Sequence, residues 1–399
     1  MISKKYKKML EGKSVIRELS EYAAVRGKEI GYENVFDYSL GNPSVPVPKE
    51  FTQTMMNLLS RKSPAELHGY SPSLGIPSVR KKIAQSLNRR FDMHYTENHI
   101  FMTTGAAGAI AHAVRCVTVP GDEVLTFAPF FPEYHPYIDL TGAVLKVVPP
   151  NIEDFQINFT LFEEMLSEKV AAVLINSPNN PSGVVYSAET IQKMADLLRK
   201  KEQEYGHEIF IISDEPYREI LFEGAESIYV SNYYDNSLSC YSYSKSLSLP
   251  GERIGYIAVN PACVDSDLIV SMCGQISRGI GHNCPPSLIQ LAVAEVVDLT
   301  ADMSVYETNM NLLYDKLIGL GFTCVKPDGT FYIFPKALEE DANVFCRKAL
   351  KYDLILVPGD TFGCPGYFRM AYCINTEKVE RSLLALDKFI KTEYGNLKV

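Results

Sequence analysis

The sequence predicts an α/β fold with a large domain, whose mostly parallel sheet is flanked by helices, and a smaller α+β domain. Its 399 residues are too many for one simple core, so we expect two domains. From about residue 99 to 259, short apolar strands alternate with helices, which is typical of a parallel sheet. Beyond residue 285 this alternation stops, and longer helices with scattered short strands follow.

Three segments are expected to build the two domains. Residues 49–285 form the large cofactor-binding domain, and residues 286–399 form most of the small domain. Residues 1–48 are an N-terminal segment that joins the small domain. The boundary near residue 285 lies inside or just before a long predicted helix, where the rhythm of the elements changes.

Composition and charge exclude several classes of protein. Hydrophobic residues make up 46% and charged residues 22%, as in an ordinary globular protein. The net charge is −9 without a basic block, so no nucleic-acid partner is expected. The basic N-terminus precedes no apolar run, and no stretch is long enough to span a bilayer, so neither a signal peptide nor a membrane partner is expected. The nine scattered cysteines have no CxxC spacing, which argues against a disulfide framework or a metal site and favours the cytoplasm.

The first hundred residues are predicted to hold helices at 14–30, 49–62 and 76–91. A short strand that begins at Phe36 runs into a Gly/Pro-rich loop at Gly41, where a bare backbone would let a substrate approach closely. Turn chemistry alone also explains this glycine. Tyr70 lies in a polar, turn-rich segment, and its phenol either packs within the loop or reaches a phosphate.

A small-residue turn follows the predicted strand at residues 100–104. Gly105, Ala106 and Ala107 open a helix there, so free backbone N–H groups and the helix dipole favour an anion such as phosphate. The turn matches neither GxGxxG nor a P-loop, which excludes these two nucleotide fingerprints. Close packing of the helix against the sheet is the alternative explanation.

Polar side chains end the later strands of the alternating region. Phe131 follows the strand at 123–128, where an aromatic ring either packs in the core or stacks on a flat cofactor. Asn180 lies in a rigid loop after the apolar strand 170–176, at the strand end where open α/β sheets bind ligands, although a plain turn asparagine is the alternative. Asp214 ends the strand 208–213, and a buried acid there needs a cationic partner, such as a protonated pyridine nitrogen. Tyr217 could then reach the hydroxyl of that ring.

An amine and two phosphate-binding groups lie close together between the strands 238–242 and 254–259. Lys245 follows Ser242 by three residues, and Arg253 follows Lys245 by eight. A cofactor with an aldehyde at one end and a phosphate at the other needs this arrangement, and pyridoxal phosphate (PLP) is such a cofactor. The alternative, an exposed lysine in a Ser-rich loop, loses only if the rest of the cofactor site lies elsewhere in the chain.

The remaining elements follow from their apolar patterns. We expect strands at 143–148, 322–325, 331–334, 355–357 and 368–372. We expect helices at 161–168, 188–201, 287–320, 344–352 and 376–394. The pattern leaves open whether the long helix at 287–320 is continuous or broken.

Taken together, these motifs resemble the fold-type I PLP-dependent aminotransferases of the aspartate aminotransferase kind (class I/II). The resemblance covers nearly the whole chain and rests on seven pieces in the family's order. They are Gly41, Tyr70, the Gly105 turn, Asn179–Gly183, Asp214–Tyr217, Ser242–Gly255, and Arg369 within Gly366–Met370.

The resemblance implies a role for each cofactor-binding residue. Lys245 forms a Schiff base (the internal aldimine) with PLP and shuttles the substrate proton. Asp214 keeps the ring nitrogen protonated, and Asn180 and Tyr217 hydrogen-bond the ring oxygen. The phosphate is held by Ser242, Arg253, the backbone of Gly105, Ala106 and Ala107, and Tyr70 from the neighbouring subunit of a homodimer. Phe131 takes the position of the stacking aromatic, where the family often has Trp or Tyr.

The resemblance also implies the substrate contacts and the reaction. Arg369 binds the substrate α-carboxylate as a bidentate fork beside Gly41 and Asn180. Members of the family can bind a second carboxylate, as in aspartate, with an arginine from the partner subunit, and Arg278 is the candidate for that arginine. The expected enzyme is a transaminase that moves an amino group between an L-amino acid and a 2-oxo acid. The alternatives are a PLP-dependent C–S β-lyase, an aminocyclopropane-carboxylate-synthase-like enzyme, and a non-catalytic PLP-binding protein.

Overall fold

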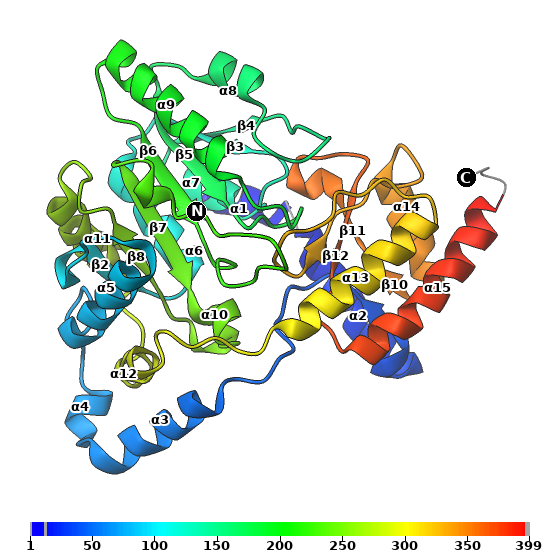
Figure 1. Cartoon of the computed structure of the whole chain (residues 1–399), viewed down its shortest axis with the longest axis horizontal. Coiled ribbons are helices and arrows are strands. Elements are labelled where there is room, and N and C mark those ends of the chain that lie inside the picture. The colour runs from blue at the N-terminus through cyan, green and yellow to red at the C-terminus, as the bar shows by residue number, and fades with distance from the viewer. Residues whose placement is uncertain (1, 12–13, 396–399) are drawn as a thin grey trace. The chain divides into compact units, whose positions relative to one another are not determined.

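A computed structural model of the chain describes residues 2–11 and 14–395 (Figure 1). The chain divides into two compact units. We call Val45–Asn180 with Val184–Met303 the large unit, and Met1–Ser44, Pro181–Gly183 and Ser304–Val399 the small unit. The predicted fold class, a mostly parallel sheet domain with a smaller α+β domain, is confirmed. The predicted domain limits at residues 48/49 and 285/286 stay a prediction.

A seven-stranded sheet forms the centre of the large unit, with the strand order β2-β8-β7-β6-β5-β3-β4 (Figure 1). Strands β4, β3, β5, β6 and β7 run parallel to one another, whereas β8 is antiparallel to both β7 and β2. The strands are β2 (Ile100–Thr103), β3 (Glu123–Phe127), β4 (Val144–Val148), β5 (Val170–Asn176), β6 (Phe210–Asp214), β7 (Ser237–Ser242) and β8 (Gly255–Val259).

Both faces of this sheet are buried, which explains why its strands are nearly continuous apolar runs. Along β5, Ala172 and Leu174 pack on one face, and Val173 and Ile175 pack on the other. We call the first the α6 face, because α6 (Ala106–Val117), α7 (Tyr134–Asp139) and α11 (Ser266–Ile280) cover it. We call the second the α9 face; it is covered by α3 (Lys49–Arg61), α5 (Pro77–Phe91), α8 (Phe159–Met165), α9 (Ala188–Tyr205) and α12 (Ser287–Glu295).

Short helical elements complete the large unit. They are α4 (Pro64–His68), α10 (Tyr243–Ser246) and the 3-10 turns η2 (Glu97–His99), η3 (Val230–Asn232) and η4 (Pro250–Glu252). Of these, α10 matters most for the site, because it begins at the last residue of β7 and contains Lys245.

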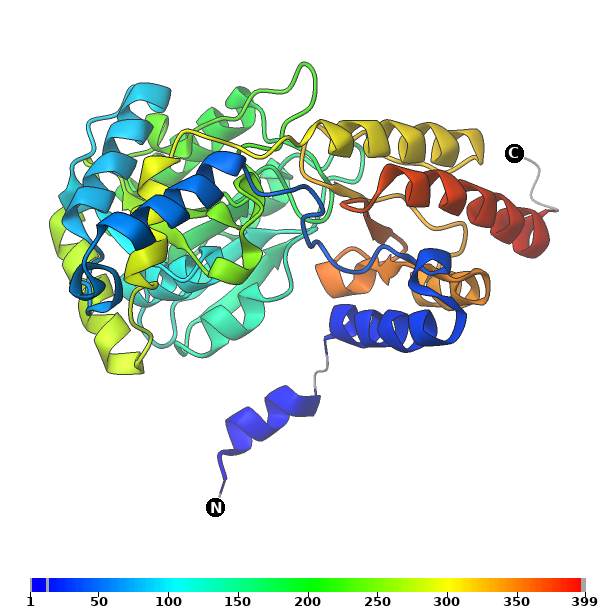
Figure 2. The ribbon, with the colours of Figure 1, turned by 90° about the horizontal axis from the view of Figure 1, so that it is seen from below.

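The small unit combines helices with two small sheets. Strand β1 (Phe36–Asp37) pairs in parallel with β10 (Leu354–Ile355), and β12 (Phe368–Ala371) pairs antiparallel with β11 (Val357–Pro358) and β9 (Tyr332–Ile333). Helices α13 and α15 lie side by side (Figures 1 and 2). The helical elements are α1 (Lys4–Glu11), α2 (Val15–Ile30), η1 (Tyr32–Asn34), α13 (Ser304–Gly319), α14 (Ala342–Ala349), η5 (Leu350–Tyr352), η6 (Gly359–Phe362) and α15 (Thr376–Tyr394). None of the helices among residues 2–11 and 14–395 has the length and apolar character to span a bilayer.

Two predicted elements differ from the structure. Residues 322–325 form no strand, so that prediction was wrong. The ring of Phe322 packs against Phe345 and Phe368, so its burial comes from aromatic contacts instead of a strand ladder. The predicted helix at 287–320 is two helices. Between them, Asp298 accepts a hydrogen bond from Ser86, and the Ala301 backbone N–H donates to the Ser246 carbonyl at 2.7 Å.

We expect Leu174→Ala to lower the free energy of unfolding of the large unit by about 2–5 kcal/mol, because it opens a cavity in a fully buried strand. Urea unfolding followed by circular dichroism measures this loss. Leu268→Ala is the matched control, since Leu268 on α11 is 55% exposed, and it should change the free energy by less than about 0.5 kcal/mol. Equal losses in the two variants would contradict the assignment of the core.

Candidate active site

The polar residues that end β5 and β6 lie side by side at one edge of the large sheet. Asn176 is the last residue of β5, and it pairs in register with Asp214, the last residue of β6. Asp214 in turn pairs with Cys240 of β7, two residues before Ser242. Parallel strands place their carboxyl ends at a common edge, where α/β sheets bind ligands. The structure therefore brings Asp214 and the strand end before Lys245 together.

Asp214 is a buried carboxyl group with an unsatisfied oxygen. Its side chain is on the α6 face, where the hydroxyl of Tyr134 donates to Oδ2 at 2.6 Å. Oδ1 has no hydrogen-bond partner among the described residues. Burial raises the pKa of Asp214 to about 7, the hydrogen bond from Tyr134 opposes this rise, and the charge of Glu215 adds to it. A cationic N–H group beside Oδ1 would both complete its hydrogen bonding and favour its ionised form.

Asn176 ties the loop after β5 to the end of β6. Its Nδ2 donates to the Asp214 carbonyl at 2.8 Å, and its Oδ1 accepts from the Asn180 backbone N–H at 2.7 Å. Asn180 is thereby held in a buried position near the end of β6. Tyr217 is also buried, three residues after Asp214, and its carbonyl accepts from the Ile220 N–H at 2.8 Å.

Lys245 lies in the one-turn helix α10 that follows β7. Ser242 begins this helix, because its Oγ accepts a hydrogen bond from the Ser244 N–H at 3.1 Å. The residue after the lysine is buried, and its carbonyl is bound by the Ala301 N–H. The lysine side chain is only partly exposed. An amine on a short helix that is fixed at both ends has a well-defined position.

The turn before α6 forms a cradle for an anion. Gly105 adopts a φ of +85°, in the left-handed region that favours glycine. A Cβ atom there would lie 3.1 Å from Nη2 of Arg253 and 3.4 Å from Oγ of Ser242, so these groups converge beside its bare backbone. Arg253 is oriented by its bond to the Thr104 carbonyl at 3.0 Å. The first N–H groups of α6 point out of the helix N-terminus and favour negative charge.

These residues fit PLP. The unsatisfied, buried oxygen of Asp214 suits a protonated ring nitrogen, and the Gly105 cradle suits a phosphate. Lys245 adds an amine on the helix that follows β7, the strand next to the one that ends in Asp214.

The two predicted substrate residues of the small unit meet at a shared aromatic side chain. Arg369 on β12 is buried, and its guanidinium lies 4.6 Å from the ring centroid of Tyr332. It donates to the carbonyl of Ser39, which precedes Gly41 by two residues. A side chain at Gly41 would collide with the hydroxyl of Tyr332. The glycine and the arginine therefore lie against the same tyrosine.

Three further predicted site residues lie in the large unit, and their roles, like those of the others, stay predictions. The half-buried ring of Phe131 packs edge-to-face against Tyr134, with a centroid distance of 5.8 Å. Tyr70 is fully exposed after α4. Arg278 is exposed in the last turn of α11.

Sequence reasoning missed three residues that position the site. Asn176 was readable as a polar residue at the end of an apolar strand, which is the same signal that singled out Asp214. Tyr134 and Tyr332 gave no such signal, because a tyrosine is as common in a hydrophobic core as in a functional site.

Comparison with known proteins identifies the family. The model of the family "Aminotransferase class I and II" matches residues 33–386. An aspartate aminotransferase of Thermotoga maritima is 29% identical over 366 residues, which cover 90% of this chain and 92% of that protein. A probable N-acetyl-LL-diaminopimelate aminotransferase of Bacillus subtilis is 29% identical over 381 residues, or 90% of each chain. The crystal structure of an amino transferase from Eubacterium rectale matches with a TM-score of 0.95 and 44% identity, covering 99% of this chain and 100% of that chain.

These findings confirm the predicted enzyme class and cofactor. The three proteins are all named aminotransferases, so the C–S β-lyase alternative is not favoured. The chain is a transaminase that uses PLP and acts on amino acids and 2-oxo acids. Because the family match extends over most of its length, the chain belongs to the aminotransferases of class I and II.

Proposed function

We propose that this transaminase takes its amino group from an L-amino acid with a second carboxylate, such as aspartate, and that Lys245, Asp214 and Tyr217 are its catalytic residues. The observation that carries the assignment of the site is the buried Oδ1 of Asp214, which has no partner among the described residues. The name of the Thermotoga maritima relative supports aspartate as the donor.

The chain's residues hold the cofactor at its two ends. Asp214 keeps a proton on the ring nitrogen, and Asn180 and Tyr217 donate hydrogen bonds to the ring oxygen. Ser242, Arg253 and the first N–H groups of α6, at Gly105, Ala106 and Ala107, bind the phosphate. Phe131 stacks on the ring. When bound, PLP supplies an electron sink for the negative charge that develops at the substrate Cα.

Other residues bind the substrate and move its proton. Arg369 binds the α-carboxylate through two parallel N–H···O bonds, and Gly41 leaves room for the substrate to approach. The Lys245 amine removes the Cα proton and later returns a proton to complete the transfer. Arg278 binds the second carboxylate of a dicarboxylic substrate.

The enzyme is proposed to act as a homodimer with a shared active site. Tyr70 supports this, because a fully exposed tyrosine after α4 is available to a neighbouring subunit, where its hydroxyl would reach the phosphate. A cytoplasmic location is supported by the nine cysteines, all of which lie in the described part of the chain and are free thiols.

Lys245→Ala should abolish both the visible absorption of lysine-bound PLP and the transamination activity, because the amine that holds the cofactor and moves the proton is gone. Absorption spectra of the purified proteins with added PLP measure this. Lys200→Ala, a change of an exposed lysine on α9, is the control and should keep both properties. Wild-type protein that stays colourless with added PLP would end the proposal.

The PLP-free protein should lose stability as the pH rises from about 4 to 7, since the folded state binds the Asp214 proton more tightly than the unfolded state does. A pKa raised from 3.8 to about 7 corresponds to a loss of about 4 kcal/mol over this window. In Asp214→Asn this contribution should be absent, whereas below about pH 4 the stabilities of the two proteins should change with pH in the same way. Urea unfolding at several pH values tests this, and parallel curves for the two proteins would count against it.

Arg278→Ala should raise KM for aspartate by roughly tenfold or more, because a charge-assisted hydrogen bond to the second carboxylate is lost. KM for alanine, which lacks that carboxylate, should stay within about twofold. Steady-state kinetics with both amino acids measure the two effects, with Arg347→Ala on the exposed side of α14 as the control. Equal effects on the two substrates would remove Arg278 from the site.

A further inference from the structure

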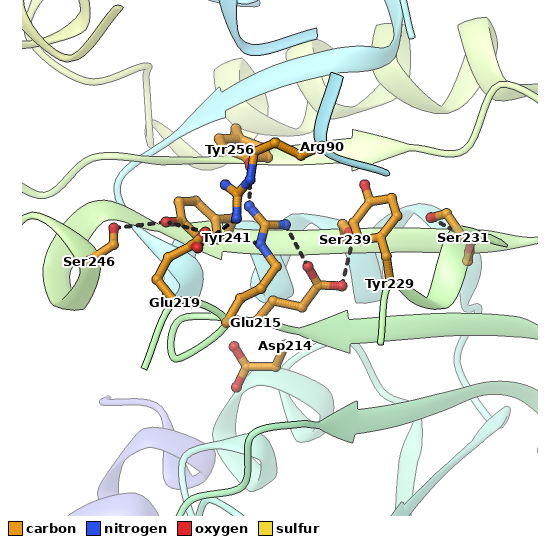
Figure 3. A network of polar contacts seen from close by, with 12 residues as sticks. Arg90, Asp214, Glu215, Glu219, Tyr229, Ser231, Ser239, Tyr241, Ser246 and Tyr256 are labelled. Carbon is orange, nitrogen blue, oxygen red and sulfur yellow. Dashed lines mark hydrogen bonds and ion pairs between the residues drawn. The ribbon is translucent and has the colours of Figure 1, made fainter. Parts of the chain in front are cut away.

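Two acidic residues stand next to each other at the end of β6, and their carboxylates point to opposite sides of the sheet (Figure 3). Asp214 lies on the α6 face with Tyr134, whereas Glu215 lies on the α9 face. Both residues are buried, with exposed fractions of 4% for Asp214 and 3% for Glu215. Two buried negative charges so close together repel each other, and the charge of Glu215 disfavours the ionised form of Asp214.

A buried arginine compensates the charge of Glu215. Nη1 of Arg218 lies 2.8 Å from Oε2 of Glu215, and Ser239 donates to the other carboxylate oxygen at 2.7 Å. Arg218 is itself only 2% exposed, and its Nη2 donates to the hydroxyl of Tyr256 at 2.9 Å. Its guanidinium also lies 4.2 Å from the ring centroid of Tyr241. Residues of β7 and β8 thus hold this cation beside Glu215.

A second ion pair extends this network to the surface. Glu219 lies 3.3 Å from Nε of Arg218 and 2.6 Å from Nη2 of Arg90 on α5. Two arginines and two glutamates therefore form a group with no formal net charge (Figure 3). Because the charges within this group cancel, the two arginines do not also balance the charge of Asp214.

Several titratable groups that face these two acids stay neutral at physiological pH. Tyr95, Tyr229 and Tyr256 face Glu215, and burial raises the pKa of each phenol. Tyr134 and Cys240 face Asp214, and burial raises the pKa of both groups as well. Among the charged groups at this strand end, Glu215 raises the pKa of Asp214, and Arg218 is the ion-pair partner of Glu215.

We propose that Arg218 is a positioning residue of the cofactor site: by neutralising Glu215 across the sheet, it allows Asp214 to stay ionised and to hold a cationic ring nitrogen. This inference rests on the proposed role of Asp214. Arg218 touches neither the proposed cofactor groups nor the substrate residues in the contacts described above, so it acts through Glu215 and Asp214.

The test is a charge cycle on the full chain, with the dissociation constant of PLP measured by equilibrium dialysis between about pH 5 and 9. PLP binding weakens at low pH once Asp214 becomes protonated. In Arg218→Met this weakening should begin at a higher pH than in the wild type, by on the order of one unit, because Glu215 is no longer neutralised. In Glu215→Gln it should begin at a lower pH.

The double variant Arg218→Met/Glu215→Gln should return close to the wild-type pH profile, because it removes the negative and the positive charge of this pair together. A purely structural role for Arg218 would instead weaken PLP binding at every pH and would not be corrected by a second substitution. Shifts in the same direction for Arg218→Met and Glu215→Gln, or no shift in either, would overturn the proposal. If Arg218→Met does not fold, the downward shift in Glu215→Gln and the recovery in the double variant decide the question.

Asp214→Asn separates this proposal from the function on which it rests. If Asp214 holds the ring nitrogen, Asp214→Asn weakens PLP binding at neutral pH. A variant that binds PLP as tightly as the wild type would defeat the proposed role of Asp214 itself. Weakened binding in Asp214→Asn, together with unshifted profiles in the Glu215 and Arg218 variants, would defeat the charge compensation alone.

Discussion

The buried carboxyl group of Asp214 is the constraint on which the large unit's site depends. The register between β5 and β6 places Asp214 at the carboxyl ends of the parallel strands, and burial raises its pKa to about 7. A group in this state is sensitive to any nearby charge, so a cation in reach of its free oxygen can switch it from the neutral to the ionised form. The same property that makes this acid costly to bury makes it suitable for holding a protonated ring.

The surroundings of Asp214 divide between the two faces of the sheet. On the α6 face, Tyr134 donates the hydrogen bond that opposes the effect of burial. On the α9 face, Arg218 balances the acid next to it. The latter network also touches the lysine helix, because Tyr241 stacks near Arg218 and donates to Ser246, the residue after Lys245, at 2.8 Å (Figure 3). One buried network thus contacts both Glu215, the neighbour of Asp214, and the helix that contains Lys245.

The strands of the large sheet could be predicted because burial on both faces requires continuous apolar runs, as in β5. The local sequence pattern did not predict the structure where packing between distant segments determines it. Phe322 is apolar and follows a helix, but it packs with other aromatic rings without joining a sheet. Helix α11 was not predicted, and the break between α12 and α13 was left open. Contacts of Asp298 and Ala301 with residues far away in the sequence hold that break.

The sequence by itself determined which chemical groups the chain offers and in what order: an amine, an acid at a strand end, a glycine turn before a helix and two arginines suited to oxyanions. These follow from residue type and from local pattern, which act over a few positions. Only the tertiary structure decided which side chains support them. Tyr134 and Asp214 are 80 positions apart, and Arg90 and Glu219 are 129 apart. Hydrogen bonds and ion pairs of this range depend on how strands and helices pack, and no local pattern encodes them.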